Sequence, residues 1–113
     1  MATENEMNRE PDFTAKLFYL TSEQGGRNSF ASSGYRPHIQ FSHKKYNTSG
    51  QQIFLNKEIV KPGENVEAEI TIIAIEEFRN ELYPGMLFKF CEGSRIIGFG
   101  EIIEIINKEL EKK

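Results

Sequence analysis

The residues best suited by type to bind a ligand are the basic ones in the middle of the chain. Residues 13–57 carry six Lys or Arg against one Glu, a net charge of +5, whereas residues 1–12 carry −3 and residues 58–113 carry −5. Basic side chains neutralise phosphate oxygens, and Tyr or His beside them can contact sugars or stack on bases, so this pattern suits RNA. It equally fits a folded domain whose solvated edges are charged unevenly. Both interpretations stay open.

Residues that could catalyse a reaction or hold a metal are few. His38 and His43 are five positions apart, which places them on opposite faces of a regular strand, so a shared metal is not expected. Cys91 lies far from both, and no nucleophile, base and orienting acid form a recognisable set. A phosphate-binding GxxxxGK[ST] loop is also absent from the sequence. We therefore predict a protein that is not an enzyme, uses no cofactor and does not bind GTP.

The single cysteine and the N-terminal residues indicate a compartment. Cys91 cannot form an internal disulfide, which fits a reducing environment. Nearby Lys89 and Arg95 could lower its pKa, or the thiol could be inert and half-buried. The first residues form no basic and apolar leader, and no stretch of 18 apolar residues occurs. We expect a cytoplasmic protein that does not contact a membrane.

Six short segments have the pattern of β-strands and would position these residues. Each is rich in β-branched or aromatic residues, most alternate apolar with polar positions, and they are separated by Gly, Pro, Asn or Ser. This indicates an all-β barrel or sandwich. The predicted strands are residues 13–20, 35–43, 52–55, 66–75, 86–91 and 95–106.

The segments between and beyond the strands complete the predicted organisation. Residues 1–12 are predicted to be a disordered lead-in, residues 13–106 one folded domain, and residues 107–113 a frayed charged tail. Residues 21–34 form a fourteen-residue loop rich in Gly and Ser, a length typical of functional loops. Residues 76–82 could form a turn of helix or an extended loop. Gly98 and Gly100 share one strand face, which indicates close approach of the backbone or a bend in the barrel.

Five motifs connect the predicted strands: Gly25-Gly26-Arg27-Asn28, Gly34-Tyr35-Arg36-Pro37-His38, Thr48-Ser49-Gly50, Lys61-Pro62-Gly63-Glu64-Asn65-Val66 and Glu92-Gly93-Ser94-Arg95-Ile96-Ile97-Gly98-Phe99-Gly100. In this order and spacing they resemble a known family, the C-terminal barrel (domain 3) of translation elongation factor Tu. The resemblance covers about residues 13–106. It implies a six-stranded antiparallel Greek-key β-barrel and a free-standing copy of a domain that, in the full factor, contacts aminoacyl-tRNA along one edge.

The resemblance and the basic segment together define a candidate RNA-binding set. Some of its members match the family's residue, and others stand where the family has a different one: Asn28 replaces His, His38 replaces Gln and Ser49 replaces Thr. Cys91 and Ser94 likewise replace Arg and Gly. The candidate residues are Arg27, Asn28, Arg36, His38, Lys44, Lys45, Ser49, Glu92, Gly93 and Arg95.

Two functions follow as hypotheses. The first is a non-catalytic, translation-linked module that binds tRNA or another RNA, either weakly or with the help of other proteins. The second is a protein-interaction module that imitates the surface of elongation factor Tu and binds a regulator, a toxin or another protein that recognises the factor. Five excess positive charges favour weak binding in the first case, since phosphate contacts weaken with salt.

Overall fold

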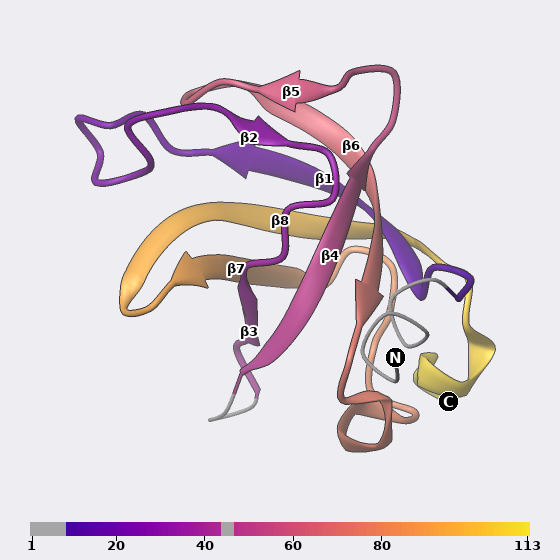
Figure 1. Ribbon diagram of the computed structural model, residues 1–113. Coiled ribbons are helices and arrows are strands. Elements are labelled where there is room, and N and C mark those ends of the chain that lie inside the picture. Colours follow the sequence, from indigo (N-terminus) through magenta and orange to yellow (C-terminus); the bar gives the residue numbers. More distant parts are fainter. Residues whose placement is uncertain (1–8, 44–46) are drawn as a thin grey trace.

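Antiparallel strands close into a barrel in the computed structural model, which describes residues 9–43 and 47–113 (Figure 1). Within this part of the chain, six strands form the barrel in the order β1-β6-β4-β3-β7-β8. The all-β fold class predicted from the sequence is confirmed. The strands are β1 (Phe13–Tyr19), β3 (His38–Phe41), β4 (Thr48–Phe54), β6 (Asn65–Ile72), β7 (Leu87–Glu92) and β8 (Arg95–Ile105).

The barrel closes because most strands point alternate, apolar residues inward. On β1 the buried residues are Phe13, Ala15, Leu17 and Tyr19, and on β6 they include Ala68. Aromatic rings fill the centre: Phe13 and Phe88 meet edge to face with ring centroids 5.9 Å apart, and Phe41 and Phe88 are tilted against each other at 5.5 Å. Such contacts add to the hydrophobic burial that holds the strands together.

Gly98 and Gly100 leave room for two of these rings. A Cβ atom on Gly98 would touch the ring of Phe90 and lie 2.5 Å from the carbonyl oxygen of Phe18. A Cβ atom on Gly100 would touch the ring of Phe88. The predicted close approach of the backbone is therefore found at Gly98, through the carbonyl of Phe18, whereas at Gly100 the close group is an aromatic side chain of β7.

Two strand boundaries differ from the prediction. β4 begins at Thr48 rather than at residue 52, because Gly50 belongs to the strand and not to the turn before it. The side chain of Ile39 occupies the space where a Cβ of residue 50 would lie, so this glycine serves close packing. β3 covers only residues 38–41 of the predicted 35–43, and Tyr35 instead forms an isolated bridge with Gln52.

Short elements outside the six predicted strands cover the ends of the barrel. β2 (Ala31–Ser32) and β5 (Ile59–Val60) pair in a small separate sheet that fastens the long loop after β1. The 3-10 helix η1 (Ile75–Phe78) follows β6 and inserts the fully buried Phe78, so the first of the two predicted conformations, a turn of helix, is correct here. A second 3-10 helix, η2 (Lys108–Leu110), follows β8.

Residues 9–12 and 107–111 are packed against the barrel, which differs from the predicted disorder and fraying at these positions. Residues 9–12 and 107–111 lie side by side at one end of the barrel (Figure 1). Asp12 and Leu110 are both fully buried. Leu110 anchors the tail because its side chain adds to the core and its backbone pairs with Leu82. Residues 1–8 lie outside the described residues.

Asp12 joins three parts of the chain. Its carboxylate forms a two-pronged ion pair with Arg9, at 2.7 and 2.9 Å, and accepts hydrogen bonds from the backbone N–H of Ile72 (2.8 Å) and the side chain of Asn107 (3.0 Å). Its backbone carbonyl also accepts from the N–H groups of Ile106 and Asn107, both at 2.9 Å. A buried carboxylate needs such partners, and here they tie both ends of the domain to β6.

Candidate nucleic-acid interface

Three of the polar residues near one end of the barrel form a cluster around Glu92. Arg27 lies in the loop after β1, Tyr35 lies before β3, and Glu92 ends β7. The carboxylate oxygen Oε2 of Glu92 is ion-paired with Nη1 of Arg27 and accepts a hydrogen bond from the Tyr35 hydroxyl. The Arg27 guanidinium also lies 4.9 Å from the centroid of the Tyr35 ring, a cation–π arrangement. We call these three residues the Glu92 cluster.

The electrostatics of the Glu92 cluster keep both Arg27 and Tyr35 as hydrogen-bond donors. Burial raises the pKa of Tyr35 above its ordinary value, and the hydrogen bond to the Glu92 carboxylate raises it further. Burial works to lower the pKa of Arg27, but its contacts with Tyr35 and Glu92 outweigh that effect and raise it. The arginine therefore stays charged, although the adjacent carboxylate offsets that charge. Oxygen Oε1 of Glu92 has no hydrogen bond within the described structure.

Strand pairing brings a second group of candidate residues next to this cluster. His38 lies opposite Ser49 of β4 and opposite Cys91 of β7, and Cys91 directly precedes Glu92. Arg95 lies opposite Glu92 across the tight turn that contains Gly93, whose positive φ of 59° suits a glycine. Because His38 and Arg95 are exposed, this edge presents polar groups to solvent.

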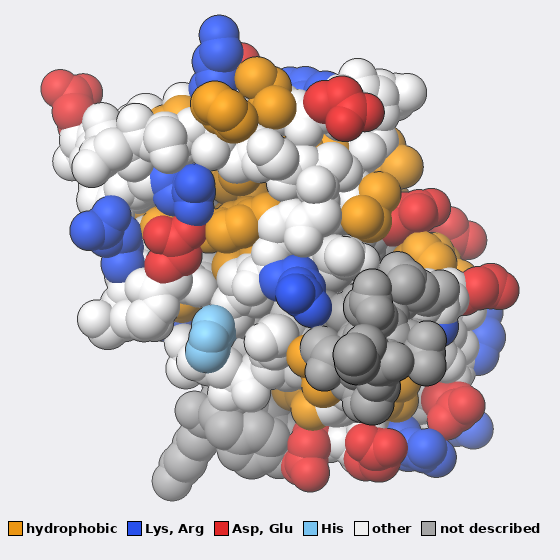
Figure 2. Space-filling view, in the orientation of Figure 1, with side chains coloured by type: hydrophobic (Ala, Val, Ile, Leu, Met, Phe, Trp, Pro, Cys, Tyr) orange, Lys and Arg blue, Asp and Glu red, His pale blue; other side chains and the backbone are white. Residues whose placement is uncertain are grey.

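Arg36 and Arg95 are the two exposed cations of this edge. Neither forms an ion pair with any residue among 9–43 and 47–113, in contrast to Arg27. Figure 2 shows that Lys and Arg side chains on the face in view are dispersed among neutral and acidic ones and form no continuous basic surface. An edge of this kind can make a few phosphate contacts but not an extensive set.

The structure does not join every predicted residue to this edge. Asn28 is exposed in the loop beside Arg27 and makes no contact with the Glu92 cluster among the hydrogen bonds of the described residues. Lys44 and Lys45 lie outside the described residues. The edge thus contains Arg27, Arg36, His38, Ser49, Glu92, Gly93 and Arg95.

Sequence reasoning missed the residues that hold the loop in place. Gln52 is fully buried, its side-chain oxygen accepts a hydrogen bond from the Tyr19 hydroxyl, and its backbone N–H donates to the carbonyl of Tyr35 at 2.8 Å. Burial raises the pKa of Tyr19 far above its ordinary range, so this hydroxyl remains a donor. The signal in the sequence was Gln52 itself, because the other residues of the predicted strand 52–55 are apolar. A polar side chain at an inward position indicates a buried hydrogen bond, since buried polar groups need partners.

Cys91 is not an activated thiol. Burial raises its pKa, and the nearby positive charge of Lys89 opposes that shift only in part. The raised pKa reduces the thiolate population and corresponds to the inert alternative.

The two histidines have separate environments. Nε2 of His43 lies 2.7 Å from a carboxylate oxygen of Glu81, whereas His38 belongs to the polar edge. Among the described residues, no group of three His, Cys, Asp or Glu side chains could hold a metal ion. In the same part of the chain, no helix has the length and apolar character needed to span a bilayer.

Comparison with known families identifies the fold. Residues 6–106 match the sequence model of the family described as the elongation factor Tu C-terminal domain. The match spans nearly all of the 113 residues and includes each strand of the barrel and every candidate residue at the polar edge. The chain belongs to the elongation factor Tu C-terminal domain family.

Proposed function

We propose that this translation-factor-like domain binds RNA through the polar edge defined above. One observation carries the proposal: loop, strand and turn segments far apart in the sequence bring Arg27, Arg95, His38 and Glu92 together at one end of the barrel, and Arg36 lies between Tyr35 and His38 in the chain. The Arg27 guanidinium is held in place before any ligand arrives, so less side-chain freedom would be lost on binding.

Each group at this edge has a suitable part of RNA to contact. Arg36 and Arg95 carry charges that no described residue neutralises, which suits phosphate oxygens. Oε1 of Glu92 is an acceptor for a ribose 2′-hydroxyl, the group that distinguishes RNA from DNA. His38 can hydrogen-bond or stack beside them. The small number of cations indicates weak binding that depends on salt.

A titration with variants tests this function. We expect the affinity for fluorescently labelled tRNA to fall with salt, with a log–log slope of roughly −2 to −3, since each phosphate contact contributes about −0.9. Replacing Arg36 and Arg95 by Ala should reduce the slope by about two and weaken binding at low salt by about tenfold or more. Fluorescence anisotropy measures both quantities.

The matched control is Arg79→Ala, which also removes one exposed arginine. Arg79 follows η1, away from the polar edge, and pairs with Glu109. Its loss should leave the affinity nearly unchanged. Absence of binding at low salt would contradict the proposal. So would a loss of affinity for Arg79→Ala equal to that for the variant that lacks both Arg36 and Arg95.

Protein binding is the second candidate function, because large apolar side chains are exposed on the outside of the barrel. Leu87 of β7 is 66% exposed, Phe99 of β8 is 46% exposed and Phe18 of β1 is 37% exposed. Outward positions of a solvated barrel are ordinarily polar, and contiguous apolar surface commonly marks a binding site.

A further inference from the structure

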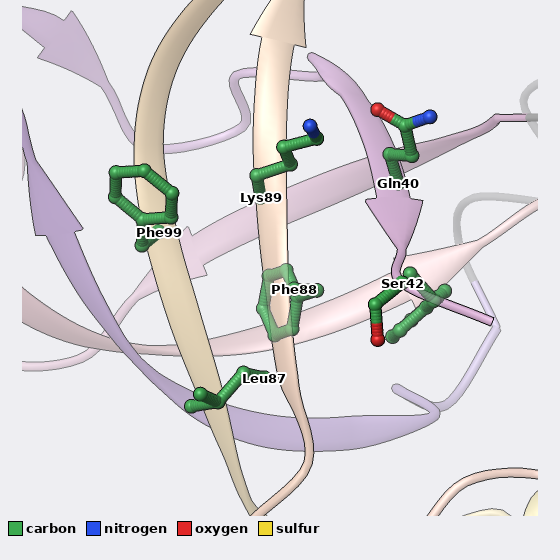
Figure 3. A pocket seen from close by; sticks show the side chains of 7 residues that line it. Gln40, Ser42, Leu87, Phe88, Lys89 and Phe99 are labelled. Carbon is green, nitrogen blue, oxygen red and sulfur yellow. The ribbon is translucent and has the colours of Figure 1, made fainter.

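A groove of about 510 Å³ lies on the outside of the barrel over the neighbouring strands β3, β7 and β8. In Figure 3, Leu87 and Phe99 lie on one side of Phe88, Gln40 and Ser42 lie on the other, and Lys89 stands at one end. Phe41 completes the lining, and like Phe88 it is buried. We call this the Leu87 groove. Its exposed apolar side chains lie on one side and its polar side chains on the other, a mixture that suits a binding site for a protein segment.

The apolar surface continues beyond the groove onto a neighbouring strand. Phe18 lies directly opposite Phe99 in the β1–β8 pairing, and Phe99 lies opposite Lys89 in the β7–β8 pairing. One row across three strands therefore reads Phe18, Phe99, Lys89. The rings and Leu87 together offer a surface wide enough for more than one apolar side chain of a partner.

The charges around this surface favour an acidic partner at the groove itself. Lys89 forms no ion pair with any described residue. Glu101 lies opposite Leu87 and opposite Lys16 in the strand pairing, but it is not among the residues that line the groove. Among the described residues that line the groove, Lys89 is the charged one, and a carboxylate placed beside it would complement it.

The strand pairing decides how a partner can bind. β7 is hydrogen-bonded to β3 on one side and to β8 on the other, so the strand that lines the groove has no free edge. A partner therefore cannot add a strand here and must bind through its side chains. An amphipathic helix laid in a groove is the recurring solution of that kind, with apolar anchors three or four residues apart.

We propose that the Leu87 groove binds an acidic amphipathic helix of another protein. An apolar side chain of that helix inserts between Leu87 and Phe99, and a carboxylate about one turn away pairs with Lys89. The inference rests on the second candidate function, and it is independent of RNA binding at the polar edge.

Selection from a random peptide library displayed on phage tests the proposal with the folded protein as bait. We expect enriched peptides to share apolar residues at helical spacing with a nearby Asp or Glu. A selected peptide should bind Leu87→Ser and Phe99→Ser more weakly by about tenfold or more. Both side chains are exposed, so the fold should tolerate either change. Ile59→Ser, which removes another exposed side chain from β5, is the control and should leave the affinity unchanged.

A charge exchange makes the test specific. Lys89→Glu should weaken the same peptide, and replacing the peptide's acidic residue by Lys should restore binding to that variant. Failure to enrich peptides, or equal binding by Leu87→Ser and the unaltered protein, would overturn the proposal. So would a loss of tRNA affinity in Leu87→Ser, because the groove would then belong to the RNA surface. If the selection fails while the tRNA titrations give the expected result, the groove proposal is overturned and the RNA-binding proposal stands.

Discussion

Replacing Asp12 by Ala is expected to lower the free energy of unfolding by about 3 kcal/mol, because it removes the carboxylate that three groups share. The guanidinium of Arg9, the N–H of Ile72 and the amide of Asn107 would lose their acceptor at a site where Asp12 is fully buried. Urea unfolding followed by circular dichroism measures the change.

Glu10→Ala is the matched control for this prediction. Glu10 is an exposed carboxylate two residues away, and only its backbone oxygen accepts a hydrogen bond from Arg9. Its loss should change stability by no more than about 0.5 kcal/mol, as is usual for surface positions. If Asp12→Ala were as mild as the control, the packed arrangement of residues 9–12 and 107–111 would be wrong.

Gly98→Ala should be of similar severity, with a cost of about 3 kcal/mol or a failure to fold, because overpacking a barrel wall forces the backbone to move. The added methyl group would meet both the Phe90 ring and the carbonyl oxygen of Phe18, and that carbonyl belongs to the neighbouring strand. A ring can turn aside at some cost, but a paired backbone cannot shift without disturbing β1 and β8.

Gly100→Ala provides the comparison, since its new methyl group would meet only the ring of Phe88 among its closest contacts. We expect it to cost less than Gly98→Ala, and Phe88→Leu should recover part of that loss, whereas Phe90→Leu should recover little at Gly98. Thermal or urea unfolding decides the order. An unchanged stability for Gly98→Ala would show that the rings do not pack over these glycines.

The strands that alternate clearly could be predicted from the sequence, and the pieces fixed by distant contacts could not. Residues 13–19 and 66–72 show period two and are strands, because side chains on one face of a strand share one environment. Gly50 lies outside the predicted strand of residues 52–55 but belongs to β4, where the side chain of Ile39 leaves room only for a glycine. The charges of residues 107–113 concealed the one apolar residue, Leu110, that anchors the segment.

For the candidate site, the motifs predicted a set of residues but not how those residues interact. Arg27 and Glu92 both belonged to the predicted set, yet they are 65 residues apart and nothing in the sequence indicated that they pair with each other. Tyr35 completes that pair through a hydroxyl whose position depends on the bridge to Gln52. Such contacts arise from the closure of the barrel, so only the folded chain reveals that Arg27 is held in place and partly neutralised.

Mapping the RNA contact by nuclear magnetic resonance tests the central claim most directly. Isotopically labelled protein would be titrated with a short RNA duplex at low salt while the backbone amide signals are followed. We predict shift changes concentrated at Tyr35, Arg36, His38, Ser49 and residues 92–95, with the signals of Leu87 and Phe99 unchanged. Changes centred on the Leu87 groove, or no changes at any RNA concentration, would contradict an RNA-binding edge built around Glu92.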